Sequence, residues 1–272
     1  MMVSFQLQKY QNRSSKLSKS KLSESQKLLD KTTVMRSGGR TLAIIRDELV
    51  QRTAIGTTFE EIESWAQELL QEHKVAPSFS TVSGYSWATC VMTNDAMCHG
   101  IPQDGVVHDG DLVTIDIGLK SSGYHLDTTV SFAVGAATAK VEEFLEIGKK
   151  SLRNAIEKVR PGISVYAISK AMQKVLDVHG FGSVYQLTGH GIGRELHMEP
   201  SIPVVANKED TYVRLSAGQT VAIEVMYTAG DAELVVSDDK WTYRTKDGSL
   251  AGMFEETVLV TETGYEVLTK SL

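Results

Sequence analysis

Hydrophobic and polar residues begin to follow a regular pattern near Asp30, and the first two segments are predicted helices. Apolar or small residues recur every three or four positions, which places them on one helix face: Val34, Gly38, Leu42, Ile45 and Leu49. A second helix is predicted to begin after Thr58, because Thr58 and Glu61 have the spacing of a capping box. Its inward face carries Phe59, Ile62, Trp65 and Leu69.

Farther along the chain, helical patterns and strand patterns interleave. One helix is predicted to begin at Thr138 and to end at Pro161-Gly162, and another to begin at Ser164 and to end at Gly180. Four runs rich in Val, Ile, Thr and Tyr are predicted strands: Leu112–Leu119, Tyr124–Val134, Thr220–Thr228 and Phe254–Val260. Two of these strands form a hairpin. The pattern therefore predicts an α+β fold, with a mixed sheet that has helices on one side rather than a regular parallel array.

The predicted hairpin carries two acidic residues, and one of them, Asp116, stands inside an apolar run. If the turn is centred between Ser121 and Ser122, Asp116 and Asp127 face each other directly across the two strands. Two ionised carboxylates ~4 Å apart repel each other by about 4 kcal/mol at an effective dielectric constant of 20. A shared proton or a cation would have to offset that repulsion. The alternatives are a slipped register that separates the two, or an ordinary solvated aspartate.

Further acids and a histidine occur in settings that are unusual for charged or polar side chains. His190 lies in the segment Gly-His-Gly-Ile-Gly, whose glycines allow a close approach of the backbone. Glu224 is embedded in a hydrophobic strand, and Glu255 and Glu256 begin another, with no Lys or Arg inside these strand cores. Each residue alone is more often structural. Together, carboxylates and imidazole without thiolates suit Mn, Fe, Co or Zn, and five such ligands fit two metal ions about 3.5–4 Å apart, a site that activates water for hydrolysis.

Composition narrows the class of protein and separates the first residues from the rest. The 272 residues have a formal charge of −6, no apolar run long enough to span a membrane, and two cysteines, too few for a disulfide framework. These features favour a reducing compartment and argue against general nucleic-acid binding. Residues 1–23 carry five basic residues and no acid. Residues 1–29 are therefore predicted to be a disordered basic tail, with an organellar transit peptide as the alternative.

The order of these motifs resembles that of the pita-bread metallopeptidases, and within them the type I methionine aminopeptidases. The resemblance runs from about Asp30 to the C-terminus. Stretches that support it are Cys98–Pro102, Asp109–Asp111, Gly123–Thr128 and Trp241–Asp247. It implies a pita-bread fold with pseudo-twofold halves, a mixed or antiparallel sheet and helices on the outer face, with residues 30–272 as a single catalytic domain.

The resemblance also implies a role for particular residues. Five would be metal ligands: Asp116, Asp127, His190, Glu224 and Glu255, with Asp127 and Glu255 bridging two divalent ions (Co, Mn, Fe or Zn). His99 would hydrogen-bond the substrate near the scissile amide, His197 would stabilise the oxyanion, and Glu224 would act as acid and base. The methionine side chain would be surrounded by Tyr85, Cys90, His99, Leu196 and Trp241.

The activity that the resemblance implies is removal of the N-terminal methionine from nascent proteins and peptides. A metal-bridging hydroxide would attack the first peptide bond. The expected partners are peptide and nascent-chain N-termini, with ribosome contact through the basic tail and no membrane. The expected state is a monomer in the cytoplasm, with organellar targeting by the tail as the alternative.

The chain departs from the usual pattern of the family at several positions. Val225 stands where Pro is usual, Glu256 where His is usual, and Met198 where Glu is usual, and the segment around Tyr85 is shorter than in many members. The pair Glu255-Glu256 leans toward a rival on the same fold, an Xaa-Pro aminopeptidase or prolidase. The Cys98–Pro102 and Trp241–Asp247 stretches argue against it. A second rival is a non-catalytic peptide-binding module, whose known members have lost metal ligands.

Overall fold

The computed structural model describes residues 31–271, and the predicted tail, residues 1–29, lies outside them. Residues 31–52 are helical and are called the N-terminal helix here. After it comes α2 (Phe59–Glu72), which begins at the predicted capping box. The Thr58 hydroxyl accepts a hydrogen bond from the Glu61 amide at 3.1 Å, and the Glu61 carboxylate accepts one from the Thr58 amide at 2.8 Å. No helix within residues 31–271 is long and apolar enough to cross a membrane.

Two more helices follow in the second part of the chain, as predicted. The first, α3 (Ala139–Ile156), begins at Thr138, whose hydroxyl accepts a hydrogen bond from the Val141 amide. The helix ends at Ile156, before the predicted Pro161-Gly162, and the residues that directly follow it form a turn. The second, α4 (Val165–His179), ends at Gly180, which has the left-handed backbone conformation expected of a helix C-terminal glycine.

The strands form two sheets within residues 31–271, and every pairing between them is antiparallel. The larger, ten-stranded sheet has the order β1-β4-β5-β12-β9-β7-β8, with β2 on β4, β13 on β12 and β6 on β9. The smaller sheet has the order β10-β11-β3. The strands are β1 Ala76–Pro77, β2 Thr89–Thr93, β3 Ala96–Cys98, β4 Leu112–Ser121, β5 Tyr124–Ala133, β6 Gly182–Ser183, β7 Thr188–Gly191, β8 Met198–Pro203, β9 Thr220–Thr228, β10 Leu234–Val236, β11 Tyr243–Thr245, β12 Ala251–Val260 and β13 Tyr265–Val267.

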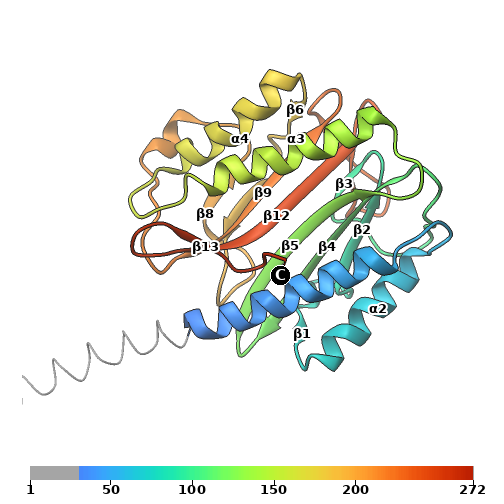
Figure 1. The fold of residues 1–272 in the computed structure, drawn as a ribbon, viewed down its shortest axis with the longest axis horizontal. Coiled ribbons are helices and arrows are strands. Elements are labelled where there is room, and N and C mark those ends of the chain that lie inside the picture. The colour runs from blue at the N-terminus through green and yellow to red at the C-terminus, as the bar shows by residue number, and fades with distance from the viewer. Residues whose placement is uncertain (1–30, 272) are drawn as a thin grey trace, which may run out of the picture.

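The helices cover one face of the large sheet (Figure 1), and each pair of helices encloses its own core. The N-terminal helix and α2 pack on β4 and β5 through residues such as Leu42, Ile62 and Ile115. The helices α3 and α4 pack on β9 and β12 around Phe144 and Val225. Both parts run in chain order from two helices to two long strands. This repetition is the pseudo-twofold arrangement that the family resemblance implies.

The two halves meet where β5 lies beside β12, and we call this contact the seam. The seam has two backbone pairs, Glu255 with Thr129 and Glu256 with Thr128. Hydroxyl groups complete it on both sides. The Thr257 hydroxyl accepts from the Asp127 amide at 3.0 Å and donates to the Asp127 carbonyl at 2.8 Å. On the other side, the Ser131 hydroxyl accepts from the Met253 amide at 2.9 Å and donates to the Met253 carbonyl at 2.8 Å. The two bridges are therefore equivalent, except that β12 provides the hydroxyl in the first and β5 provides it in the second.

The predicted register of the β4–β5 hairpin is wrong by two residues. Ser122 and Gly123 both have positive φ, 48° and 80°, which makes them the two central residues of a type I′ turn. The turn is therefore centred between Ser122 and Gly123, not between Ser121 and Ser122. Asp116 lies opposite Thr129, and Asp127 lies opposite Gly118. Because the slip is an even number of residues, Asp116 and Asp127 still point to the same face of the sheet.

Candidate metal centre and active site

Five strands bring the predicted metal ligands to one cavity of about 250 Å³. All five side chains are buried, and the atoms that three of them offer as ligands, on Asp127, His190 and Glu255, lie within 4.8 Å of one another. The ligands and their strands are Asp116 on β4, Asp127 on β5, His190 on β7, Glu224 on β9 and Glu255 on β12.

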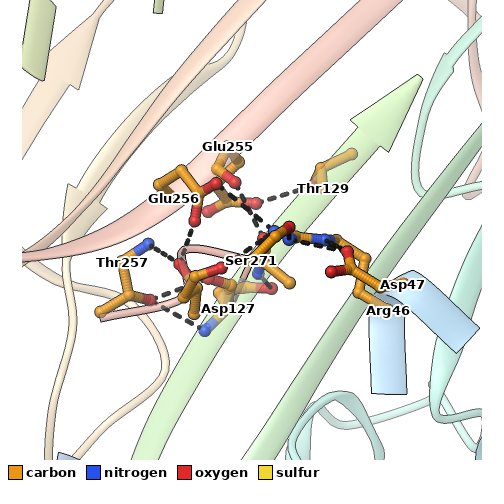
Figure 2. Close-up of polar contacts among 10 residues, drawn as sticks. Arg46, Asp47, Asp127, Thr129, Glu255, Glu256, Thr257 and Ser271 are labelled. Carbon is orange, nitrogen blue, oxygen red and sulfur yellow. Dashed lines mark hydrogen bonds and ion pairs between the residues drawn. The ribbon is translucent and has the colours of Figure 1, made fainter. Parts of the chain in front are cut away.

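Threonine groups at the seam hold the carboxylates in place. The Thr129 hydroxyl lies 2.8 Å from Asp116 Oδ1 and 2.7 Å from Glu255 Oε2, so it connects an acid of the first half with an acid of the second. The amide of Thr128 donates to Asp127 Oδ1 at 3.0 Å. Figure 2 shows Thr129 beside Glu255, with Asp127 nearby on the neighbouring strand.

The buried carboxyls lack a compensating positive charge. Burial raises the pKa of Asp116 to about 7. Burial, followed by repulsion from the other carboxylates, raises the pKa values of Asp127, Glu224 and Glu255 well above their usual range. Within residues 31–271, no lysine or arginine forms an ion pair with any of the four. Divalent cations would supply the missing charge, and the oxygen and nitrogen donors present are those of a Mn, Fe, Co or Zn site.

His190 is prepared to act as a neutral ligand. Burial lowers its pKa to about 4, so the imidazole is uncharged at neutral pH. Its Nδ1 lies 2.9 Å from the carbonyl oxygen of Gly191 and donates to it, which is a common support for a metal-binding histidine. Nε2 is then free of its proton and lies 4.0 Å from Glu224 Oε1.

Two more predicted histidines lie on the wall of the cavity. The ring of His197 packs edge-on against that of His190, with 4.6 Å between centroids. The ring of His99 packs edge-on against Tyr243. Burial lowers the pKa values of His99 and His197, so both imidazoles are neutral hydrogen-bonding groups.

The predicted methionine pocket is assembled at the same cavity. All five predicted residues line it: Tyr85, Cys90, His99, Leu196 and Trp241. The Tyr85 ring meets the Trp241 ring edge-on with 5.1 Å between centroids, and its hydroxyl donates to the Thr89 carbonyl at 2.7 Å. The pocket wall is thus aromatic and sulfur-containing, which suits an unbranched thioether.

The sequence analysis missed several residues that also line the cavity. They are Phe79, Val82, Cys98, Gln186, Leu187, Thr188, Met226 and Met253. Three of them carried a signal: Thr188, Met226 and Met253 stand two residues from His190, Glu224 and Glu255, and residues two apart on a strand share a face. The others come from elsewhere in the chain, where sequence spacing does not indicate proximity.

The unusual residues of this chain lie outside the carboxylate cluster. Val225 and Glu256 follow cavity acids on β9 and β12, so their side chains point to the opposite face of the sheet. Val225 is buried in the core beneath α3, and Glu256 pairs with Arg46. Met198 is 40 % exposed at the edge of the sheet, beside His197. None of the three departures removes a donor from the cavity.

Comparison with known proteins identifies the family of the chain. The model of metallopeptidase family M24 matches residues 33–262. The chain belongs to metallopeptidase family M24. A curated relative, methionine aminopeptidase 1 of Bacillus subtilis, is 35% identical over 239 residues, which are 87% of this chain and 95% of that protein.

Solved structures of M24 proteins show the same fold. The crystal structure of a methionine aminopeptidase from Thermotoga maritima matches with a TM-score of 0.86 and 35% identity, over 89% of this chain and 97% of that one. A prolidase from Pyrococcus furiosus matches with a TM-score of 0.73 at 22% identity and is covered to 64%. That second likeness is one of fold alone. The predicted pita-bread fold and the predicted family are confirmed.

Proposed function

We propose that this M24 protein is a metal-dependent methionine aminopeptidase, which removes the N-terminal methionine from peptides and nascent proteins. The observation that carries the proposal is the cavity itself. Four buried carboxylates and a neutral histidine stand at one part of it, and an aromatic and sulfur-containing wall at another. The names of its relatives agree with this activity.

Two divalent metal ions would be held by Asp116, Asp127, His190, Glu224 and Glu255. When bound, such ions act as Lewis acids and lower the pKa of water. The family uses metal, and four buried carboxyls without a paired lysine or arginine fit two divalent cations. We propose Co, Mn, Fe or Zn as candidates, because the donors are oxygen and imidazole nitrogen.

The residues around the carboxylates have separate tasks in the proposed reaction. The neutral His197 would donate a hydrogen bond to the carbonyl oxygen, where negative charge develops. His99 would donate to the amide nitrogen of the scissile bond and help it leave. Glu224 would take the proton of the attacking water and return it to that nitrogen, so that the new amine leaves uncharged.

The specificity pocket would accept one unbranched side chain. Tyr85 and Trp241 form an edge-on aromatic wall, and Cys90 lies 3.2 Å from the Tyr85 hydroxyl. Apolar, polarizable contacts of this kind favour a thioether, while a branched or charged side chain would be poorly accommodated.

An assay with two peptides separates methionine removal from the proline-directed alternative. Hydrolysis of Met-Ala-Ser and Ala-Pro-Ala is compared with added Mn²⁺ or Co²⁺ after removal of bound metal. We expect faster cleavage of Met-Ala-Ser. Faster cleavage of Ala-Pro-Ala would favour an Xaa-Pro enzyme, and absence of both metal binding and hydrolysis would favour a non-catalytic module.

We further propose residues 30–272 as one catalytic domain of a cytoplasmic monomer, with residues 1–29 as a basic arm that contacts ribosomal RNA phosphates. Residues 1–23 of the arm carry five basic residues and no acid, so its attraction to phosphate should weaken with salt. Co-sedimentation with ribosomes at low salt is expected to fall when residues 1–25 are deleted. Equal co-sedimentation would contradict the proposed arm.

A further inference from the structure

Arg46 of the N-terminal helix lies directly beneath the seam, on the face of the sheet opposite the cavity. It is only 5 % exposed. Its Nη1 donates to the Thr128 hydroxyl at 2.9 Å and to the Thr269 carbonyl at 3.1 Å, and lies 3.4 Å from Glu256 Oε1. Figure 2 shows Arg46 reaching from the helix toward Glu256 on β12.

The remaining donors of the guanidinium group are also satisfied. Nε and Nη2 donate to Asp47 Oδ1 at 3.0 and 2.9 Å, and Nη2 also donates to the Ser271 hydroxyl at 2.7 Å. Glu256 in turn accepts a hydrogen bond from the Thr269 hydroxyl. Arg46 therefore holds parts of both halves of the protein in one fixed geometry, as a planar guanidinium with several donors can do.

Two residues that Arg46 contacts, Thr128 and Glu256, directly follow two of the proposed metal ligands in the chain. Thr128 follows Asp127 in β5, and its hydroxyl donates a hydrogen bond to the Glu255 carbonyl at 2.9 Å. Glu256 follows Glu255 in β12 and pairs with Thr128 across the seam. A shift of Arg46 or Glu256 would thus change the separation of Asp127 and Glu255 directly.

A restraint at the seam matters because its backbone ladder is short and the carboxyls beside it repel one another when ionised. It has two backbone pairs, whereas β9 and β12 share nine. On the cavity face, Asp116 and Asp127 of one half stand against Glu224 and Glu255 of the other, and like charges push the strands apart. On the opposite face, Arg46 contacts Thr128 of β5 and Glu256 of β12, and so holds the two strands together.

We propose that Arg46 and Glu256 are a positioning pair, which fixes the spacing between the carboxylates of the two halves and so the geometry of the metal site. This inference rests on the proposed metal centre. It gives Glu256, which stands where the family usually has His, a role together with a partner on the N-terminal helix. Residues that orient metal ligands without binding the metal themselves typically contribute 10- to 100-fold to metal affinity.

The test compares Arg46→Met with Arg36→Met in the full-length protein. Arg36 lies on the same helix and pairs with Glu266 of β13 at 2.8 Å, so it is a matched control that does not contact the seam. Mn²⁺ affinity is measured by titration calorimetry on metal-free protein, and the visible absorption bands of bound Co²⁺ report coordination geometry. We expect Arg46→Met to weaken Mn²⁺ binding by about tenfold or more and to change the Co²⁺ bands, with both unchanged in Arg36→Met.

Failure of the positioning role can be distinguished from failure of the proposed metal centre. If Arg46→Met binds Mn²⁺ with wild-type affinity and shows the wild-type Co²⁺ bands, even at lower thermal stability, the pair is only structural and the inference is overturned. If Arg46→Met does not fold, Glu256→Gln carries the same test, because it removes the charge and keeps the shape. If the wild type itself binds no metal, the proposed metal centre falls, and the inference falls with it.

Discussion

Asp116 and Asp127 point to the same face of the β4–β5 hairpin but lie two residues out of direct opposition. Thr129 stands opposite Asp116 in the hairpin and opposite Glu255 across the seam. Its hydroxyl consequently lies within hydrogen-bond distance of both carboxyls. The offset between the two aspartates is what leaves room for this link between the halves.

Asp127→Asn is expected to abolish hydrolysis by removing a proposed metal ligand, while the protein stays folded. Replacing a carboxylate that repels three others relieves strain in the metal-free protein, so its Tm should be equal to or above that of the wild type. Metal content by mass spectrometry, Tm and peptide hydrolysis are measured, with the exposed Asp238→Asn as control. Wild-type turnover in purified Asp127→Asn would refute its role as a ligand.

Thr129→Val keeps the side-chain shape and removes the hydroxyl between Asp116 and Glu255. Both carboxyls then lose an orienting partner, so we expect Mn²⁺ affinity to fall by about 10- to 100-fold. The control is Thr53→Val, which removes a buried hydroxyl that donates to the Leu49 carbonyl, away from the cavity. Equal Mn²⁺ affinities in the two variants would contradict the prediction.

His197→Ala is expected to lower kcat by about 10²- to 10³-fold, because one donor to the developing oxyanion is lost. Metal content should stay close to that of the wild type, because His197 contacts the His190 ring edge-on and is not itself a proposed ligand. Single-turnover kinetics with a methionyl peptide, at saturating metal, measure the effect. The exposed His73→Ala is the control, and a wild-type kcat in His197→Ala would remove this residue from the mechanism.

Stability of the metal-free protein should fall as the pH rises from 6.5 to 8. Burial raises the pKa of Asp116 to about 7, and burial with repulsion between the carboxylates raises the pKa values of the other three carboxyls well above their usual range. A carboxyl with a raised folded-state pKa binds its proton more tightly in the folded protein, so it contributes full stability at low pH and progressively less as the pH rises toward that pKa. Each unit of raised pKa corresponds to about 1.4 kcal/mol.

The buried His190 changes stability in the opposite direction as the pH rises, but it does so below pH 6.5. Burial lowers the pKa of His190 from 6.5 to about 4, so its contribution changes only between those values. Calorimetry after treatment with EDTA, with and without saturating Mn²⁺, measures the effect. We expect the loss of Tm between pH 6.5 and 8 to shrink when metal is present. A metal-free Tm that rises over that interval would be inconsistent with buried uncompensated carboxyls.

Glu63→Gln is expected to raise KM for methionyl peptides several-fold with little change in kcat. The Glu63 carboxylate on α2 accepts hydrogen bonds from the Ala88 amide at 2.8 Å, the Thr89 amide at 3.0 Å and the Thr89 hydroxyl at 2.6 Å. Thr89 then holds the Tyr85 hydroxyl through its carbonyl. A glutamine places an amide donor against these donors, which should loosen the pocket wall. The exposed Glu68→Gln on the same helix is the control, and equal KM values would exclude the effect.

Local signals in the sequence were sufficient for the elements and for the faces of the sheet. The Thr58–Glu61 capping box and the period of the apolar residues predicted α2, and acids embedded in apolar strands marked the cavity side of β4, β9 and β12. These signals depend on a few neighbouring residues, so they are readable without the fold. The end of α3 was misplaced because the turn after Ile156 depends on packing as well as on Pro161.

Register and long-range pairing were decided only in the folded protein. The two-residue slip in the hairpin followed from the positive φ of Ser122, which allows a type I′ turn that spacing alone did not identify. The pairing of Arg46 with Glu256 joins residues 210 positions apart, and no local pattern connects them. The sequence thus determined which acids and histidines point to the cavity, since residue type and strand period are local properties. The tertiary structure decided how far apart those residues stand, because that distance is set at the seam by contacts between two halves that are remote along the chain.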